Sequence, residues 1–140
     1  PDALSDLIRA FASCAERDLE LMEQGRAFGA LIAGITGKTV SVRPYPVAVG
    51  LATQALNVPD EEVLALFLQS AAAQMISAAT RFLPMGQTRA QALLASLAPQ
   101  ITETARNAAQ QTLDQIASFT PGAEMAAMRH ETLEVRIFRT

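Results

Sequence analysis

The sequence predicts an all-α protein, a multi-helix bundle of five or more helices with one hydrophobic helix at its centre. Composition favours helices over sheets, because 27 of the 140 residues are alanine and half are hydrophobic while only 5% are aromatic. Apolar residues also recur at three- and four-residue spacing along most of the chain. No long linker interrupts this pattern, so we expect residues 1–140 to form a single helical domain.

The first expected helix starts at the beginning of the chain, where Asp2 or Ser5 can cap it. Helical periodicity begins almost at once and position 1 is not methionine, so we expect the N-terminal part of the parent domain to be missing. Four glycines between positions 25 and 37 then predict a close helix crossing followed by termination. The apolar face of this first helix consists of Leu4, Leu7, Ile8, Phe11, Ala15, Leu19 and Met22.

A loop is expected over residues 38–45, because Pro44 and Pro46 cannot continue a helix. Pro46 fits the first turn of a second helix, which runs to Leu56 and stops near Asn57. The acidic residues 60–62 then mark the start of a third helix.

The third helix is expected from Asp60 to about Phe82, and apolar residues surround most of it. This pattern places it at the centre of the bundle. Its uncharged run approaches the length of a membrane span, but several polar residues within that run would be costly in hydrocarbon, so we expect a soluble helix. The polar residues Ser70, Gln74, Ser77 and Arg81 recur along one line of this helix.

A turn is expected at residues 84–87, followed by a fourth helical stretch that Thr88 caps and that extends to Ile116. Pro99 should kink or split this stretch. A last helical segment carries Met125 and Met128, and residues 133–137 then alternate like a strand, so their conformation stays open.

Charge and cysteine content exclude several functions. The net charge of −3 gives no electrostatic footprint for nucleic acid or an anionic membrane. The single cysteine, Cys14, cannot form an internal disulfide, and no signal peptide is recognisable, so we expect a cytoplasmic protein.

Metal and nucleotide sites lack support in the pattern. The segment 34–39 partly resembles a phosphate-binding loop, but Ile32 replaces the required glycine and the preceding residues look helical, so a helix C-cap is the better interpretation. The chain has one histidine, His130, and one cysteine, far apart in sequence, so no ligand spacing supports a metal, and no cofactor is expected. Cys14 lies on the apolar stripe without an activating base, as a small buried thiol would.

The charge distribution suggests a protein interface. Residues 63–102 contain no carboxylate, and their charged residues are Arg81 and Arg89. Interface cores are poor in charge and favour arginine, so part of this surface should contact a second copy or another protein. A helix hairpin buried in a larger parent domain explains the same pattern.

Residues 121–140 are expected to act as a C-terminal docking segment. The end of this segment combines several arginines with large apolar residues, which a disordered tail would be poorer in. Arginine and phenylalanine together are typical of binding hot spots.

At these residues the sequence resembles the UreF family of urease accessory proteins. Several matches occur in the right order across nearly the whole chain, which makes the resemblance more specific than any single match. It rests on Gly-Arg-Ala-Phe-Gly at 25–29, Pro-Val-Ala-Val-Gly-Leu-Ala at 46–52, Leu-Pro-Met-Gly-Gln-Thr at 83–88, Arg-His-Glu-Thr-Leu at 129–133 and Arg-Ile-Phe-Arg-Thr at 136–140.

The resemblance implies an all-α, dimeric assembly factor and not an enzyme. Proteins of this family bind the UreD scaffold, called UreH in some systems, and recruit the GTPase UreG in a complex that delivers nickel to apo-urease. The resemblance implies partner-binding residues in two patches, with Arg136 the first choice and the two patches expected to lie close together. They are Arg129, His130, Glu131, Arg136, Phe138 and Arg139 in the tail, and Arg81, Pro84, Gly86 and Gln87 at the turn.

Two other functions stay open on the residues alone. A helical small-ligand-binding regulatory domain would need an enclosed apolar pocket, to which Ser70, Gln74 and Ser77 could supply polar groups. An enzyme would need a perturbed acid or base in a cleft, with Glu20, Glu23 and His130 as candidates.

Overall fold

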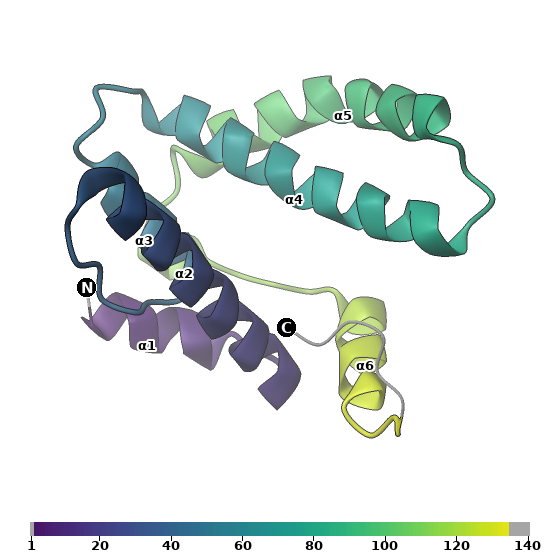
Figure 1. Cartoon of the computed structure of the whole chain (residues 1–140), viewed down its shortest axis with the longest axis horizontal. Coiled ribbons are helices and arrows are strands. Elements are labelled where there is room, and N and C mark those ends of the chain that lie inside the picture. Colours follow the sequence, from purple (N-terminus) through teal and green to yellow (C-terminus); the bar gives the residue numbers. More distant parts are fainter. Residues whose placement is uncertain (1, 135–140) are drawn as a thin grey trace. The chain divides into compact units, whose positions relative to one another are not determined.

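The computed structural model describes residues 2–134, and within them every regular element is a helix (Figure 1). The predicted all-α fold is therefore confirmed. Two compact units emerge, one of Pro1–Leu56 with Ala117–Thr140 and one of Asn57–Ile116. That residues 1–140 form one domain stays a prediction. The elements are α1 (Asp2–Ala10), α2 (Ala15–Thr36), α3 (Tyr45–Thr53), α4 (Asp60–Phe82), α5 (Gln87–Ala108), the short 3₁₀ helix η1 (Leu113–Gln115) and α6 (Pro121–His130).

The first helix is broken, where the periodicity predicted one helix as far as Met22. Helix α1 tightens at its end, because the Phe11 and Ala12 N–H groups donate to carbonyls three residues back. Cys14 is then extended, with φ −157° and ψ 165°, and α2 begins at the next residue. The same apolar spacing is thus shared by two helices, because periodicity alone does not register a break of a few residues.

The glycine-rich half of α2 stays helical and ends at Gly37, which adopts the left-handed conformation with φ 70°. Its N–H donates to the Ala33 carbonyl oxygen at 2.8 Å. The expected C-cap is confirmed, and no strand precedes residues 34–39 as a phosphate-binding loop would require.

Helices α2 and α3 pack closely in the first unit, and the close approach predicted from the glycines falls at Gly25. A Cβ atom there would lie 1.8 Å from the Arg43 carbonyl oxygen. Pro44 is fully buried, and the rings of Phe28 and Tyr45 meet edge to face at 5.7 Å. Helix α3 has Pro46 in its first turn as expected, but it ends at Thr53 and not near Leu56.

The second unit is a hairpin of α4 and α5. Helix α4 has the predicted bounds. The hairpin buries alanines from both helices, Ala72, Ala90 and Ala105, so small side chains let the two backbones approach. Glu61 and Arg106 form an exposed ion pair across it at 3.4 Å.

Helix α5 differs from the prediction at both ends. It starts at Gln87 with Gly86 as its N-cap, so Thr88 lies inside the helix and does not cap it. It continues unbroken through Pro99 and ends at Ala108, well before Ile116. The hydrogen bonds of Thr112 with Gln115 in η1 replace the last expected helical turn.

Helix α4 is more exposed than its apolar pattern predicted. Leu66 and Met75 are 67% and 68% exposed, and α5 is the element with which α4 shares its main contacts. Among residues 2–134, α4 is also the one helix long and apolar enough to cross a membrane by length and composition. Exposed apolar surface of this kind is typical of interaction sites.

Candidate partner-binding surfaces

The C-terminal end of helix α6 is held against the start of α2. His130 lies in the last turn of α6, and its Nδ1 atom is 2.5 Å from Glu16 Oε1. Glu131 follows at the C-cap, and its Oε1 accepts a hydrogen bond from the Glu16 N–H group at 2.8 Å. Two of the predicted tail residues therefore have internal partners.

Glu131 acts as a helix cap supplied from a distant part of the sequence. The N-cap residue of α2, Cys14, makes no side-chain cap hydrogen bond. The Glu131 carboxylate satisfies one of the free N–H groups at this helix start, where negative charge is also favoured by the helix dipole. We name the contact of Glu16, His130 and Glu131 the α2–α6 latch.

The α2–α6 latch leaves one polar atom without a described partner. Glu16 Oε2 is buried and accepts no hydrogen bond from the residues that the structure describes. Burying such an atom costs free energy unless another group satisfies it. Sequence reasoning missed Glu16, because a pairing across 114 residues has no local signal.

The remaining tail residues divide into two groups. Arg129 lies exposed in the last turn of α6. Arg136, Phe138 and Arg139 lie outside the described residues, so the structure does not test their predicted role.

The second patch lies at the exposed connection between α4 and α5. Arg81 is in the last turn of α4, where a positive charge complements the helix dipole. Leu83 is extended and donates its N–H to the Ala79 carbonyl oxygen at 2.8 Å, which ends the helix. The structure thus brings four predicted residues together on one exposed turn: Arg81, Pro84, Gly86 and Gln87.

Two apolar residues of this turn were not predicted as binding residues. Phe82 and Leu83 are both more than half exposed beside Arg81. Exposed large apolar side chains next to an arginine have the composition of a protein-binding hot spot. The periodic pattern had counted them as core, because it cannot tell a buried stripe from an interface stripe. We name Arg81, Phe82, Leu83, Pro84, Gly86 and Gln87 the hairpin-turn patch.

The tail and the hairpin-turn patch belong to different units. Their expected proximity stays a prediction.

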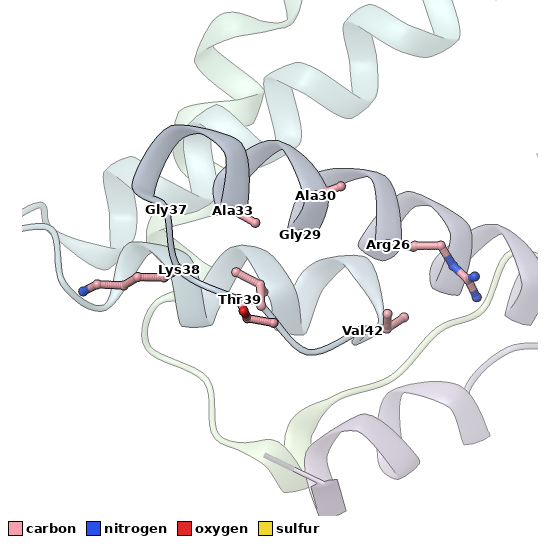
Figure 2. A pocket seen from close by; sticks show the side chains of 9 residues that line it. Arg26, Gly29, Ala30, Ala33, Gly37, Lys38, Thr39 and Val42 are labelled. Carbon is pink, nitrogen blue, oxygen red and sulfur yellow. The ribbon is translucent and has the colours of Figure 1, made fainter.

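The polar line of α4 does not fit a ligand pocket. Ser70, Gln74 and Ser77 are exposed. The cavity between α4 and α5 has a volume of 200 Å³ and is lined instead by Gln69, Gln91 and apolar residues of α5. A larger groove of 340 Å³ lies between α2 and the segment that follows it (Figure 2).

The acids considered for catalysis lie in exposed ion pairs. Glu20 pairs with Arg17, and Glu23 pairs with Arg26 at 3.4 Å. Cys14 is half-buried in the break between α1 and α2, and not inside an apolar stripe as expected. Within residues 2–134 no group of three or more His, Cys, Asp or Glu side chains could hold a metal ion.

The class of protein that follows is an all-helical one whose exposed surfaces combine apolar side chains with arginine. Comparison with known proteins makes this specific. A family profile for UreF matches residues 1–98. The urease accessory protein UreF of Cereibacter sphaeroides is 53% identical over 140 residues, which is all of this chain and 67% of that protein. UreF of Paracoccus denitrificans is 48% identical over 137 residues, 98% of this chain and 64% of that protein, and UreF of Jannaschia sp. is 42% identical over 139 residues, 99% and 63%.

The chain belongs to the UreF family of urease accessory proteins, and the resemblance seen in its motifs is confirmed. It spans about two thirds of the length of the curated relatives it matches. Proteins of this family are accessory factors and not enzymes, so the non-catalytic expectation is also confirmed.

Proposed function

We propose that this chain is a non-enzymatic assembly factor that bridges the UreD (UreH) scaffold and the GTPase UreG during nickel insertion into apo-urease. The observation that carries the proposal is the hairpin-turn patch, where Arg81 stands beside the exposed side chains of Phe82 and Leu83. In a member of a urease accessory family, such a surface is suited to a protein partner.

The exposed face of α4 supports the same proposal. Leu66 and Met75 expose most of their apolar surface next to the polar line of Ser70, Gln74 and Ser77. Such a mixed face packs well against protein, whereas its polar groups would be unsatisfied in a bilayer. We therefore propose a cytoplasmic protein that works as a homodimer, without a cofactor, and contacts neither nucleic acid nor membrane.

The C-terminal docking segment is proposed as the second partner surface. The α2–α6 latch holds the end of helix α6, which is the first part of this segment, against α2, because His130 and Glu131 both contact Glu16. Arg129, which is exposed, and Arg136 beyond it are then the residues we expect to reach acceptors on a partner.

Co-purification with each partner separately tests the proposal. The tagged chain should retain UreD and UreG, and Arg81→Glu or Arg136→Ala should reduce retention of at least one of them. Arg106→Ala is the matched control, because Arg106 is exposed near the end of α5 and pairs with Glu61 near the start of α4, at the opposite end of the hairpin from the hairpin-turn patch. Failure of the unchanged, folded chain to retain either partner would contradict the proposal.

A further inference from the structure

A groove runs along the C-terminal half of helix α2, in the unit that also contains α3. Its walls are α2 on one side and the segment 38–42 on the other, with a volume of 340 Å³ (Figure 2). The floor is formed by small and β-branched residues. Gly29 lies against this segment, since a Cβ there would be in ordinary contact, at 3.5 Å, with the Val40 side chain.

The groove is apolar between two positive ends. Figure 2 shows the side chains of Arg26 and Lys38 at opposite ends of it. Residues 24–59 contain no carboxylate, so the chain on both walls carries positive charge only. Arg26 forms an ion pair with Glu23 at 3.4 Å. Lys38, the single lysine of the chain, forms no ion pair with the described residues.

The groove also has a wall of unpaired backbone. Residues 38–44 run without a helix, turn or bend, and the β-branched residues Thr39, Val40 and Val42 favour an extended chain. Within the described part of the chain, no backbone hydrogen bond involves the N–H groups of residues 39–42. Extended backbone with free donors and acceptors can receive a further strand.

We propose that this groove binds an extended segment of a partner protein that has an apolar centre and carboxylates at its ends. The segment adds a strand to residues 38–42 through backbone hydrogen bonds, and its small apolar side chains lie against Gly29, Ala30 and Ala33 of α2. The carboxylates meet Lys38 and Arg26. The residues of this groove differ from those of the hairpin-turn patch and of the C-terminal docking segment, so we count the groove as a third contact surface of the protein.

The test uses two capped peptides that differ only in end charge, acetyl-Glu-Val-Thr-Val-Glu-amide and acetyl-Lys-Val-Thr-Val-Lys-amide, titrated into the full ¹⁵N-labelled chain. The Glu-ended peptide should shift the amide signals of residues 39–42, and N-methylation of its central residue should remove those shifts. Lys38→Glu should weaken the affinity for the Glu-ended peptide about fivefold, the effect expected when an exposed ion pair becomes a repulsion. Lys38→Arg keeps the charge and should bind as the unchanged chain does.

Three results would overturn the proposal. One is the absence of shifts at residues 39–42 with the Glu-ended peptide at millimolar concentration. Another is equal affinity for both peptides, or an equal loss of affinity for the Glu-ended peptide in Lys38→Glu and Lys38→Arg. The third is a change of oligomeric mass in Lys38→Glu by sedimentation, which would show that a second copy of this chain occupies the groove. Lys38 is exposed, so circular dichroism should show unchanged helix content in both variants.

Discussion

At the scale of single residues, two glycines of α2 have opposite roles although both lie inside the same helix. Gly25 faces the backbone of Arg43 so closely that a Cβ would lie 1.8 Å from its carbonyl oxygen, whereas a Cβ at Gly34 would meet nothing within 4 Å. The first glycine is required by packing. The second makes no such contact, and its main effect is to give the unfolded chain more conformational freedom to lose on folding.

Gly25→Ala should therefore destabilise the chain by about 1–3 kcal/mol, because the crossing of residues 43–45 over α2 must move apart. Gly34→Ala should stabilise it by about 0.5–1 kcal/mol through helix propensity. Urea unfolding of the two variants beside the unchanged chain measures both free energies. Equal effects of the two substitutions would show that the close approach at Gly25 does not exist in solution.

The α2–α6 latch makes a second prediction at this scale. His130→Ala removes the group 2.5 Å from Glu16 Oε1, so neither that oxygen nor the buried Oε2 keeps a hydrogen-bond partner among the described residues. Helix α6 should then open on the order of tenfold more often, the equivalent of about 1.4 kcal/mol. Hydrogen exchange of the α6 amides measures this. Arg129→Ala, at the neighbouring exposed position, should leave exchange unchanged, and similar rates in both variants would refute the latch.

At the scale of elements, an exposed ion pair joins α1 to α2. The Arg9 guanidinium donates to both Asp18 carboxylate oxygens at 2.7 Å. These hydrogen bonds hold the pKa of Asp18 below its ordinary value of 3.8. A lowered pKa in the folded state means that the pair stabilises the fold at pH above 3.8, and that this contribution is lost as the pH falls through the lowered pKa.

Asp18→Asn should therefore lower the free energy of unfolding at neutral pH. The difference in free energy of unfolding between the variant and the unchanged chain should become smaller as the solution becomes acidic. Chemical denaturation at a series of pH values from about 7 to about 2 measures that difference. A difference in free energy of unfolding that stayed constant down to the lowest pH would show that the charge of Asp18 does not stabilise the fold.

Proline 99 is the other feature that acts on an element. Helix α5 continues through it, although proline lacks the N–H that would bond to the Ala95 carbonyl. Pro99→Ala should raise the free energy of unfolding by up to about 3 kcal/mol, the cost of an interior proline. Pro121→Ala, in the first turn of α6, should change it by less than about 0.5 kcal/mol. No gain from Pro99→Ala would mean that α5 tolerates its proline without loss.

The helix boundaries show which features could be predicted from the sequence and which could not. The bounds of α4 follow from the acidic residues at its start and the apolar run to Phe82, and both signals are local. The break between Ala10 and Ala15 carries no proline or glycine, so the pattern ran through it. The α2–α6 latch joins Glu16 to residues more than a hundred positions away, and pairings of that kind depend on the tertiary fold.

At the scale of the whole molecule, little of the apolar surface is buried by the chain itself. Among residues 2–134 the buried hydrophobic residues are two in α3 and three alanines of α4 and α5, while many of the larger apolar side chains, such as Leu31, Leu66, Met75 and Phe119, are more than half exposed. A chain with this balance gains stability by binding, because covering apolar surface is favourable by about 25 cal/mol per Å². The composition predicted an interface from charge alone, but not that the apolar stripe of α4 would itself be the exposed surface.

The most direct test of the central claim is whether this chain joins UreD to UreG. UreD fixed to a resin should retain UreG only when the chain is added, and the eluted complex should contain all three proteins by native mass spectrometry. Arg81→Glu should reduce UreG or UreD in that complex, while Arg106→Ala should not. Retention of UreG by UreD in equal amount without the chain would contradict the bridging role.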